Sequence, residues 1–150
     1  MAKPKVFVDS SCIIASLLSS KGGSFYILNT LTDEFEFQTN DYGLREIQEV
    51  FKSKFFHHPG LQTKLFLLLG SARVNILPNP SRRDKTRFSK YISANDAPIL
   101  ASAIKYCDYL LTLDNEFFSK GIIKLAESKG LTILKPKEFI QEQRKIKAAP

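Results

Sequence analysis

Four acidic residues lie next to apolar segments, which are usually buried and where an unpaired charge is unfavourable. Asp9 follows the apolar residues 6–8, Asp114 ends the run "YLLTLD", Asp96 opens the apolar segment "APILASAI", and Glu46 adjoins Ile47. Carboxylates packed together raise one another's pKa unless a cation neutralises them. Oxygen ligands without a metal-spaced cysteine or histidine pair suit Mg²⁺ or Mn²⁺. Such an ion can activate water and stabilise the leaving oxygen of a phosphodiester.

Helical periodicity predicts where two of these acids point. At 100° per residue, Asp96 lines up with Leu100, Ala103 and Cys107, so it lies on the face that its helix turns toward a sheet. Glu46 lies at the rim of an apolar helical stripe and can face a cleft.

Each acid also has an ordinary interpretation. Asp9, Asp96 and Asp114 stand where helix N-caps or turn residues occur, and Glu46 could be a solvated helix residue. A shared site is favoured only when the four acids are considered together.

Strands and helices alternate along the chain. The predicted strands are residues 6–8, 34–39, 73–78, 108–114 and 131–136. Predicted helices begin after Asp9 and cover residues 22–33, 41–56, 61–69, 95–107 and 121–130, and a last one begins on Pro136. Residues 141–150 are predicted to fray into a basic tail after a domain of residues 1–140.

This order predicts right-handed crossovers and a mainly parallel sheet covered by helices on both sides. Ligands of such sheets collect outside the carboxyl ends of the strands. Asp9 and Asp114 both end strands, so they should open onto one edge.

Composition narrows the class of protein. A chain of 150 residues that is 43% hydrophobic fits one globular domain. Cys12 and Cys107 lack metal spacing and fit reduced, buried thiols in a cytoplasmic protein. No apolar stretch reads as a signal peptide or a membrane anchor, and the net charge of +7 favours a polyanionic partner.

Four segments together resemble a PIN domain, the ribonuclease fold that includes the toxins of VapBC-type toxin-antitoxin pairs. They are "VFVDSS", "LREIQEV", "NDAPILASAIKYCDYLLTLDNEFF" and "ILKPKEFI", in that order between about residue 5 and residue 140. The resemblance implies a three-layer α/β/α sandwich with a five-stranded sheet, metal-dependent RNA cleavage, and commonly homodimers.

The resemblance also implies roles for individual residues. Asp9, Asp96 and Asp114 become ligands of Mg²⁺ or Mn²⁺, and Glu46 becomes a ligand or a water-orienting acid. Ser10 and Thr112 support the site. Glu116 either adds a carboxylate or is an exposed residue of a helix start. The chain departs from the family pattern at Asn95, where relatives often have an acid, and at Leu113, where they often have glycine.

The leading hypothesis is therefore a metal-dependent ribonuclease that acts as the toxin of a type II toxin-antitoxin pair, with an antitoxin protein as partner. The alternatives are an RNA-processing PIN nuclease and a non-catalytic RNA-binding module. The 12 Phe and 5 Tyr residues agree with a homodimer.

A basic segment precedes Asp96. In "SRRDKTRFSK", the cations Arg82, Arg83, Lys85 and Arg87 could guide RNA toward the acids, or the segment could be a solvated loop.

Overall fold

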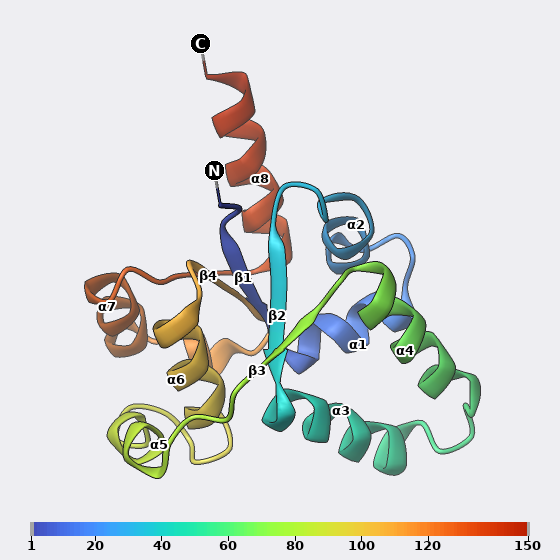
Figure 1. Ribbon diagram of the computed structural model, residues 1–150, viewed down its shortest axis with the longest axis horizontal. Coiled ribbons are helices and arrows are strands. Elements are labelled where there is room, and N and C mark those ends of the chain that lie inside the picture. The colour runs from blue at the N-terminus through green and yellow to red at the C-terminus, as the bar shows by residue number, and fades with distance from the viewer. Residues whose placement is uncertain (1, 150) are drawn as a thin grey trace.

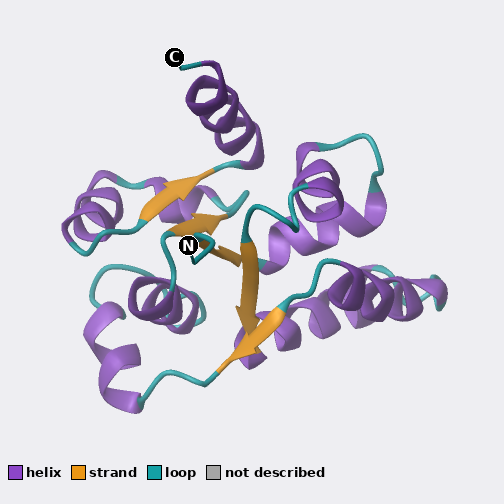
Figure 2. Ribbon diagram, turned by 45° about the horizontal axis from the view of Figure 1, so that its top comes forward, coloured by secondary structure: helices purple, strands orange, loops and turns teal. Residues whose placement is uncertain are grey.

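The computed structural model describes residues 2–149 and contains a five-stranded parallel sheet in the order β3-β2-β1-β4-β5 (Figures 1 and 2). Its strands are β1 (Lys5–Val8), β2 (Glu36–Asn40), β3 (Asn75–Leu77), β4 (Tyr109–Leu111) and β5 (Thr132–Leu134). Helices cover both faces, so the predicted three-layer α/β/α architecture is confirmed.

The helices fall into two groups, one on each face of the sheet. One group comprises α1 (Ser10–Leu18), α2 (Gly23–Thr30), α3 (Asp41–Lys54), α4 (Gly60–Ser71) and α8 (Pro136–Ala148). The other comprises α5 (Arg82–Phe88), α6 (Ala97–Tyr106), the 3₁₀ helix η1 (Asn115–Phe118) and α7 (Lys120–Ser128). Figure 1 shows α5, α6 and α7 on the opposite side of the sheet from α1 and α4.

The central strand β1 explains this division. Side chains alternate across a strand, so Val6 and Val8 enter the core beneath α1 and α3, whereas Phe7 enters the core beneath α6 and α7. All three side chains are completely buried. The buried part of β1 is apolar on both faces, as is common in parallel sheets, and Asp9 follows directly after its last residue.

Among the described residues, no single helix is long and apolar enough to cross a membrane. Helices α1 and α2 together reach that length and apolarity, but they are bent by 94°. Both bury apolar side chains such as Ile13 and Leu28 in the core.

Two segments differ from the sequence predictions. The basic segment from Arg82 to Phe88 is a helix and not a solvated loop, because Ser81 accepts the Asp84 amide at 3.1 Å as an N-cap and Phe88 is buried. Helix α8 continues to Ala148, so fraying from residue 141 is wrong for the described residues. An ion pair of 2.9 Å between Lys147 and Glu34 holds the end of α8.

Hydrogen bonds of the Asn40 side chain fix the start of α3. The buried Asn40 side chain accepts the Gly43 amide at 3.0 Å and donates to Ser102 of α6 at 2.8 Å. One side chain therefore caps α3 and ties it to α6, the two helices that carry Glu46 and Asp96. Gly43 lies where a Cβ atom would come 2.6 Å from Thr39 Oγ1.

We expect Gly43→Ala to lower the free energy of unfolding by about 1–3 kcal/mol, because the methyl group would overlap the buried Thr39 side chain. Gly70→Ala is the matched control. A Cβ atom at Gly70 in α4 meets nothing within 4 Å, so alanine should be neutral or stabilising by up to about 1 kcal/mol. Urea denaturation measures both, and equal effects would contradict the close approach at Gly43.

Candidate metal centre

Asp9 lies at the carboxyl end of β1 with only 3% of its surface exposed. Its Oδ2 atom accepts hydrogen bonds from Thr112 Oγ1 at 2.7 Å and from Ser11 Oγ at 3.0 Å. Oδ1 is buried and has no hydrogen-bond partner among residues 2–149. Asp9 precedes α1, yet its side chain makes no capping hydrogen bond, so capping does not account for it.

Glu46 reaches the same region from α3. Ser10, the first residue of α1, donates its hydroxyl to Glu46 Oε2 at 2.6 Å. This bond links the end of β1 to α3 and fixes the Glu46 carboxylate beside Asp9. The sequence predicted Ser10 as a supporting residue, and its contact with Glu46 supplies a physical means of support.

Thr112 connects the two acids at the strand ends. It donates to Asp9 and accepts the Asp114 backbone amide on the same hydroxyl at 3.0 Å. Strand β4 ends at Leu111, so Asp114 lies three residues beyond it and not on its last residue as predicted. Asp114 Oδ1 accepts the Glu116 amide at 3.0 Å and caps η1. For Asp114, unlike Asp9, the ordinary interpretation as a helix cap is therefore correct.

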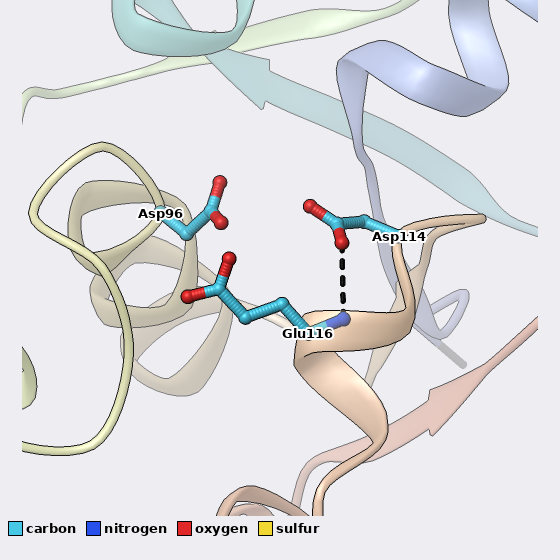
Figure 3. Close-up of side chains that lie close together, drawn as sticks. All are labelled: Asp96, Asp114 and Glu116. Carbon is cyan, nitrogen blue, oxygen red and sulfur yellow. Dashed lines mark hydrogen bonds between the residues drawn. The ribbon is translucent and has the colours of Figure 1, made fainter.

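Asp96 faces Asp114 and Glu116 from the start of α6 (Figure 3). One carboxylate oxygen from each of the three residues lies within 4.8 Å of the others. Asp96 is 8% exposed and its side chain does not cap α6; instead its Oδ2 accepts the Ser93 hydroxyl at 3.1 Å. Glu116 is exposed but oriented, because its Oε1 accepts the Ser93 amide at 2.8 Å.

Burial and neighbouring charge both act on the acids of the site. Burial is the largest cause of a raised pKa at Asp9, Glu46 and Asp96, and the negative charge of Asp114 adds to the rise in all three. For Asp96 the pKa rises to about 7, with the Glu116 carboxyl group as a further cause. The hydrogen bond from the Ser93 backbone lowers the pKa of Glu116.

This donor set fits a hard divalent cation. Two oxygens on opposite sides of one Mg²⁺ lie about 4.2 Å apart, so the oxygens of Asp96, Asp114 and Glu116 are close to a ligand arrangement. The unpartnered oxygen of Asp9 adds a further acceptor nearby. A cation would stabilise the charged form that burial and the neighbouring carboxylates disfavour, so the cluster can hold a metal ion.

The structure brings only two of the four predicted acids into one close cluster. Asp96 and Asp114 come together with Glu116 as the third member. Glu46 is linked to the segment after Asp9 through the Ser10 hydroxyl, and Thr112 links Asp9 to the backbone of Asp114. The individual roles of these residues stay predictions.

Ser93 and Asn40 were not among the predicted site residues. A serine three residues before a helix-start aspartate, and an asparagine directly before Asp41, were the available signals for these partners.

A cleft of about 460 Å³ lies against this cluster. It is lined by residues of α3, of the segment before α6 and of η1, namely Tyr42, Arg45, Glu46, Glu49, Ser93, Ala94, Asn95, Asp96 and Glu116. The position of Asn95 at the cleft shows that this departure from the family pattern removes a charge from the site wall.

Two solved structures share this architecture. VapBC2 from Rickettsia felis, bound to a DNA fragment from its promoter, contains a chain that matches with a TM-score of 0.63 and 20% identity, over 87% of this chain and 98% of that chain. PAE2754 from Pyrobaculum aerophilum matches with a TM-score of 0.62 and 16% identity, over 94% of this chain and 97% of that one. The chain has a PIN-like α/β fold. This confirms the resemblance that the motifs indicated.

No protein-family model matches the sequence, and no curated protein matches it significantly. The similarity to the two solved structures is therefore a similarity of fold.

The raised pKa of Asp96 predicts a pH-dependent stability of the metal-free protein. The folded-state value of about 7 exceeds the ordinary value of 3.8, so the native state binds more protons between these limits. The stabilising contribution is complete below about pH 4 and is lost as the pH rises to about 7. Relative to Asp96→Asn, the wild type should therefore lose stability between pH 5 and pH 8.

Urea denaturation in EDTA at both pH values tests this prediction. Glu127→Gln, an exposed change on α7, is the control and should follow the wild type. Parallel behaviour of wild type and Asp96→Asn would refute the assignment of the raised pKa to Asp96.

Proposed function

We propose that this protein is a Mg²⁺- or Mn²⁺-dependent ribonuclease and the toxin component of a type II toxin-antitoxin pair. The observation that carries the proposal is the grouping of Asp96, Asp114 and Glu116 within 4.8 Å at the carboxyl edge of a PIN-like sheet. Asp9 and Glu46 lie beside this group and within the electrostatic influence of Asp114. The protein would act in the cytoplasm, where RNA and metal are both present.

Each residue has a definite task in this proposal. Asp9, Asp96 and Asp114 hold the ion, with Glu116 as a further ligand. When bound, the ion supplies Lewis-acid activation of water and neutralises charge on the phosphodiester. Glu46 orients the attacking water and can accept its proton, because burial raises its pKa and Ser10 fixes its carboxylate. Thr112 holds Asp9 and Asp114 at a constant separation, because its hydroxyl group donates to the Asp9 carboxylate and accepts the Asp114 amide.

Two alternatives share the fold. An RNA-processing PIN nuclease would use the same residues without an antitoxin, and a non-catalytic RNA-binding module would bind RNA without cutting it. The toxin assignment is supported by the structural likeness to VapBC2. A neighbouring reading frame for a small DNA-binding protein would favour the toxin, and RNA binding without cleavage would favour the module.

We expect cleavage of single-stranded RNA that EDTA abolishes and that Mg²⁺ or Mn²⁺ restores. Asp9→Asn keeps the shape of the side chain but weakens metal binding, so activity should fall at least about 100-fold, since even residues that only orient a ligand contribute 10- to 100-fold. Glu127→Gln removes an acid from the surface of α7 and should retain full activity. Undiminished cleavage by folded Asp9→Asn would overturn the role of Asp9.

The proposed partners are a second copy of the chain and an antitoxin protein. Apolar surface supports a protein interface, because Phe66 and Leu67 on α4 are 64% and 68% exposed. Leu67 also lines a hollow of about 500 Å³ with Leu17, Leu18 and Phe25 of α1 and α2.

Light scattering of the purified chain should give the mass of a dimer at micromolar concentration. Burying exposed apolar side chains such as Phe66 against a second copy supplies the driving force. A monomeric mass across this range would contradict the homodimer and leave the antitoxin as the proposed occupant of the apolar surface.

Helix α5 supplies a candidate outer contact for RNA. Arg82, Arg83 and Arg87 line an open hollow with Thr86 and Lys90. We propose that these arginines contact the RNA backbone outside the cleft.

A further inference from the structure

Lys85 departs from the other cations of α5. It does not line the hollow formed by Arg82, Arg83 and Arg87, and its ammonium group donates to the Tyr42 hydroxyl at 2.8 Å. Tyr42 belongs to the first turn of α3, only four residues before Glu46. The basic segment therefore divides into two parts, of which Lys85 is the part that meets the acidic cleft.

Arg45 completes a group with Tyr42 and Lys85. Its guanidinium carbon lies 4.8 Å from the centroid of the Tyr42 ring, and both residues line the cleft that contains Asp96 and Glu116. Lys85 contacts the hydroxyl end of the same ring, so its interaction is a hydrogen bond and not stacking on the ring face. One aromatic side chain that lines the cleft thus contacts two cations, of which Arg45 also lines the cleft.

These two cations are not neutralised by the acids beside them. Within residues 2–149, neither Arg45 nor Lys85 forms an ion pair with a carboxylate, although Glu46 and Glu49 share the helix of Arg45. An arginine that stacks on an aromatic ring keeps its hydrogen-bond donors free for a phosphate. Positive charge next to the acidic cluster also offsets the repulsion between that cluster and a polyanion.

We propose that Arg45 and Lys85, held in place by Tyr42, bind the RNA phosphate adjacent to the one that is cut. Arg45 and Lys85 contact substrate, whereas Tyr42 is a positioning residue that acts through them. This inference rests on the proposed function for the identity of the substrate. It deepens that function by naming the contact that places RNA across the acidic cleft.

The first test measures the affinity of the full chain for a fluorescent single-stranded RNA in EDTA, across a salt series. Arg45→Gln should bind about tenfold more weakly and reduce the slope of log affinity against log salt by about 0.7. Tyr42→Phe keeps the ring beneath Arg45 but removes the hydroxyl that holds Lys85. Its affinity for RNA should therefore lie between that of the wild type and that of Arg45→Gln. Lys52→Gln removes the same charge from the last turn of α3, away from the cleft, and should bind RNA like the wild type.

The second test follows cleavage in Mg²⁺. Arg45→Gln should raise KM with little change in kcat, because the carboxylates remain intact. Stabilisation of the protein by Mg²⁺, measured as a shift in Tm, should equal that of the wild type.

The outcomes separate this inference from the proposed function. RNA cleavage with Arg45→Gln and Lys52→Gln equal in affinity, salt slope and KM would overturn the inference and leave the ribonuclease standing. Weaker, less salt-dependent binding by Arg45→Gln in a protein that cuts no RNA would support the RNA contact of Arg45. It would overturn the ribonuclease and the placement of that contact beside a cut phosphate. A wild type that binds no RNA would overturn both.

Discussion

Three carboxylates, Asp9, Glu46 and Asp96, are buried or partly buried at one edge of the sheet, and the hydrogen bonds around them answer this burial. Burial is the largest cause of the raised pKa at each of these three acids, and the negative charge of Asp114 adds a smaller rise at all three. Hydroxyl and amide donors from Ser10, Ser11, Ser93 and Thr112 offset part of this cost. The remaining charge is what a divalent cation can neutralise, so an arrangement that is unfavourable without metal is suited to binding one.

The scaffold brings these charges together through polar links between neighbouring elements. Asn40 ties α3 to α6, Ser10 ties α1 to α3, and Thr112 ties β1 to the segment that follows β4. The parallel order of the strands explains why these links lie close together, since the carboxyl ends of β1, β2 and β4 share one edge. The apolar cores on the two faces position the helices, and the polar links set the side chains.

Charge on the surrounding surface complements this site. The chain carries a net charge of +7, yet the cations near the cleft are arranged in two distinct ways. Arg82, Arg83 and Arg87 face an open hollow, whereas Arg45 and Lys85 converge on Tyr42 at the cleft itself. Arg45 lines the same cleft as Asp96 and Glu116, whereas the α5 arginines line a separate hollow, so Arg45 is the better placed to act on a phosphate in the cleft.

The sequence by itself determined the order of strands and helices, the inward direction of Asp96 and the position of Asp9 at a strand end, because these follow from apolar periodicity along the chain. It did not determine the helix of residues 82–88, where the Ser81 cap and buried Phe88 prevail over polar composition, or the length of α8. Only the tertiary structure placed Glu116 with Asp96 and Asp114, and Lys85 with Tyr42. These contacts join residues from different elements, and the relative positions of those elements are set by the packing of helices on the sheet, which local sequence does not encode.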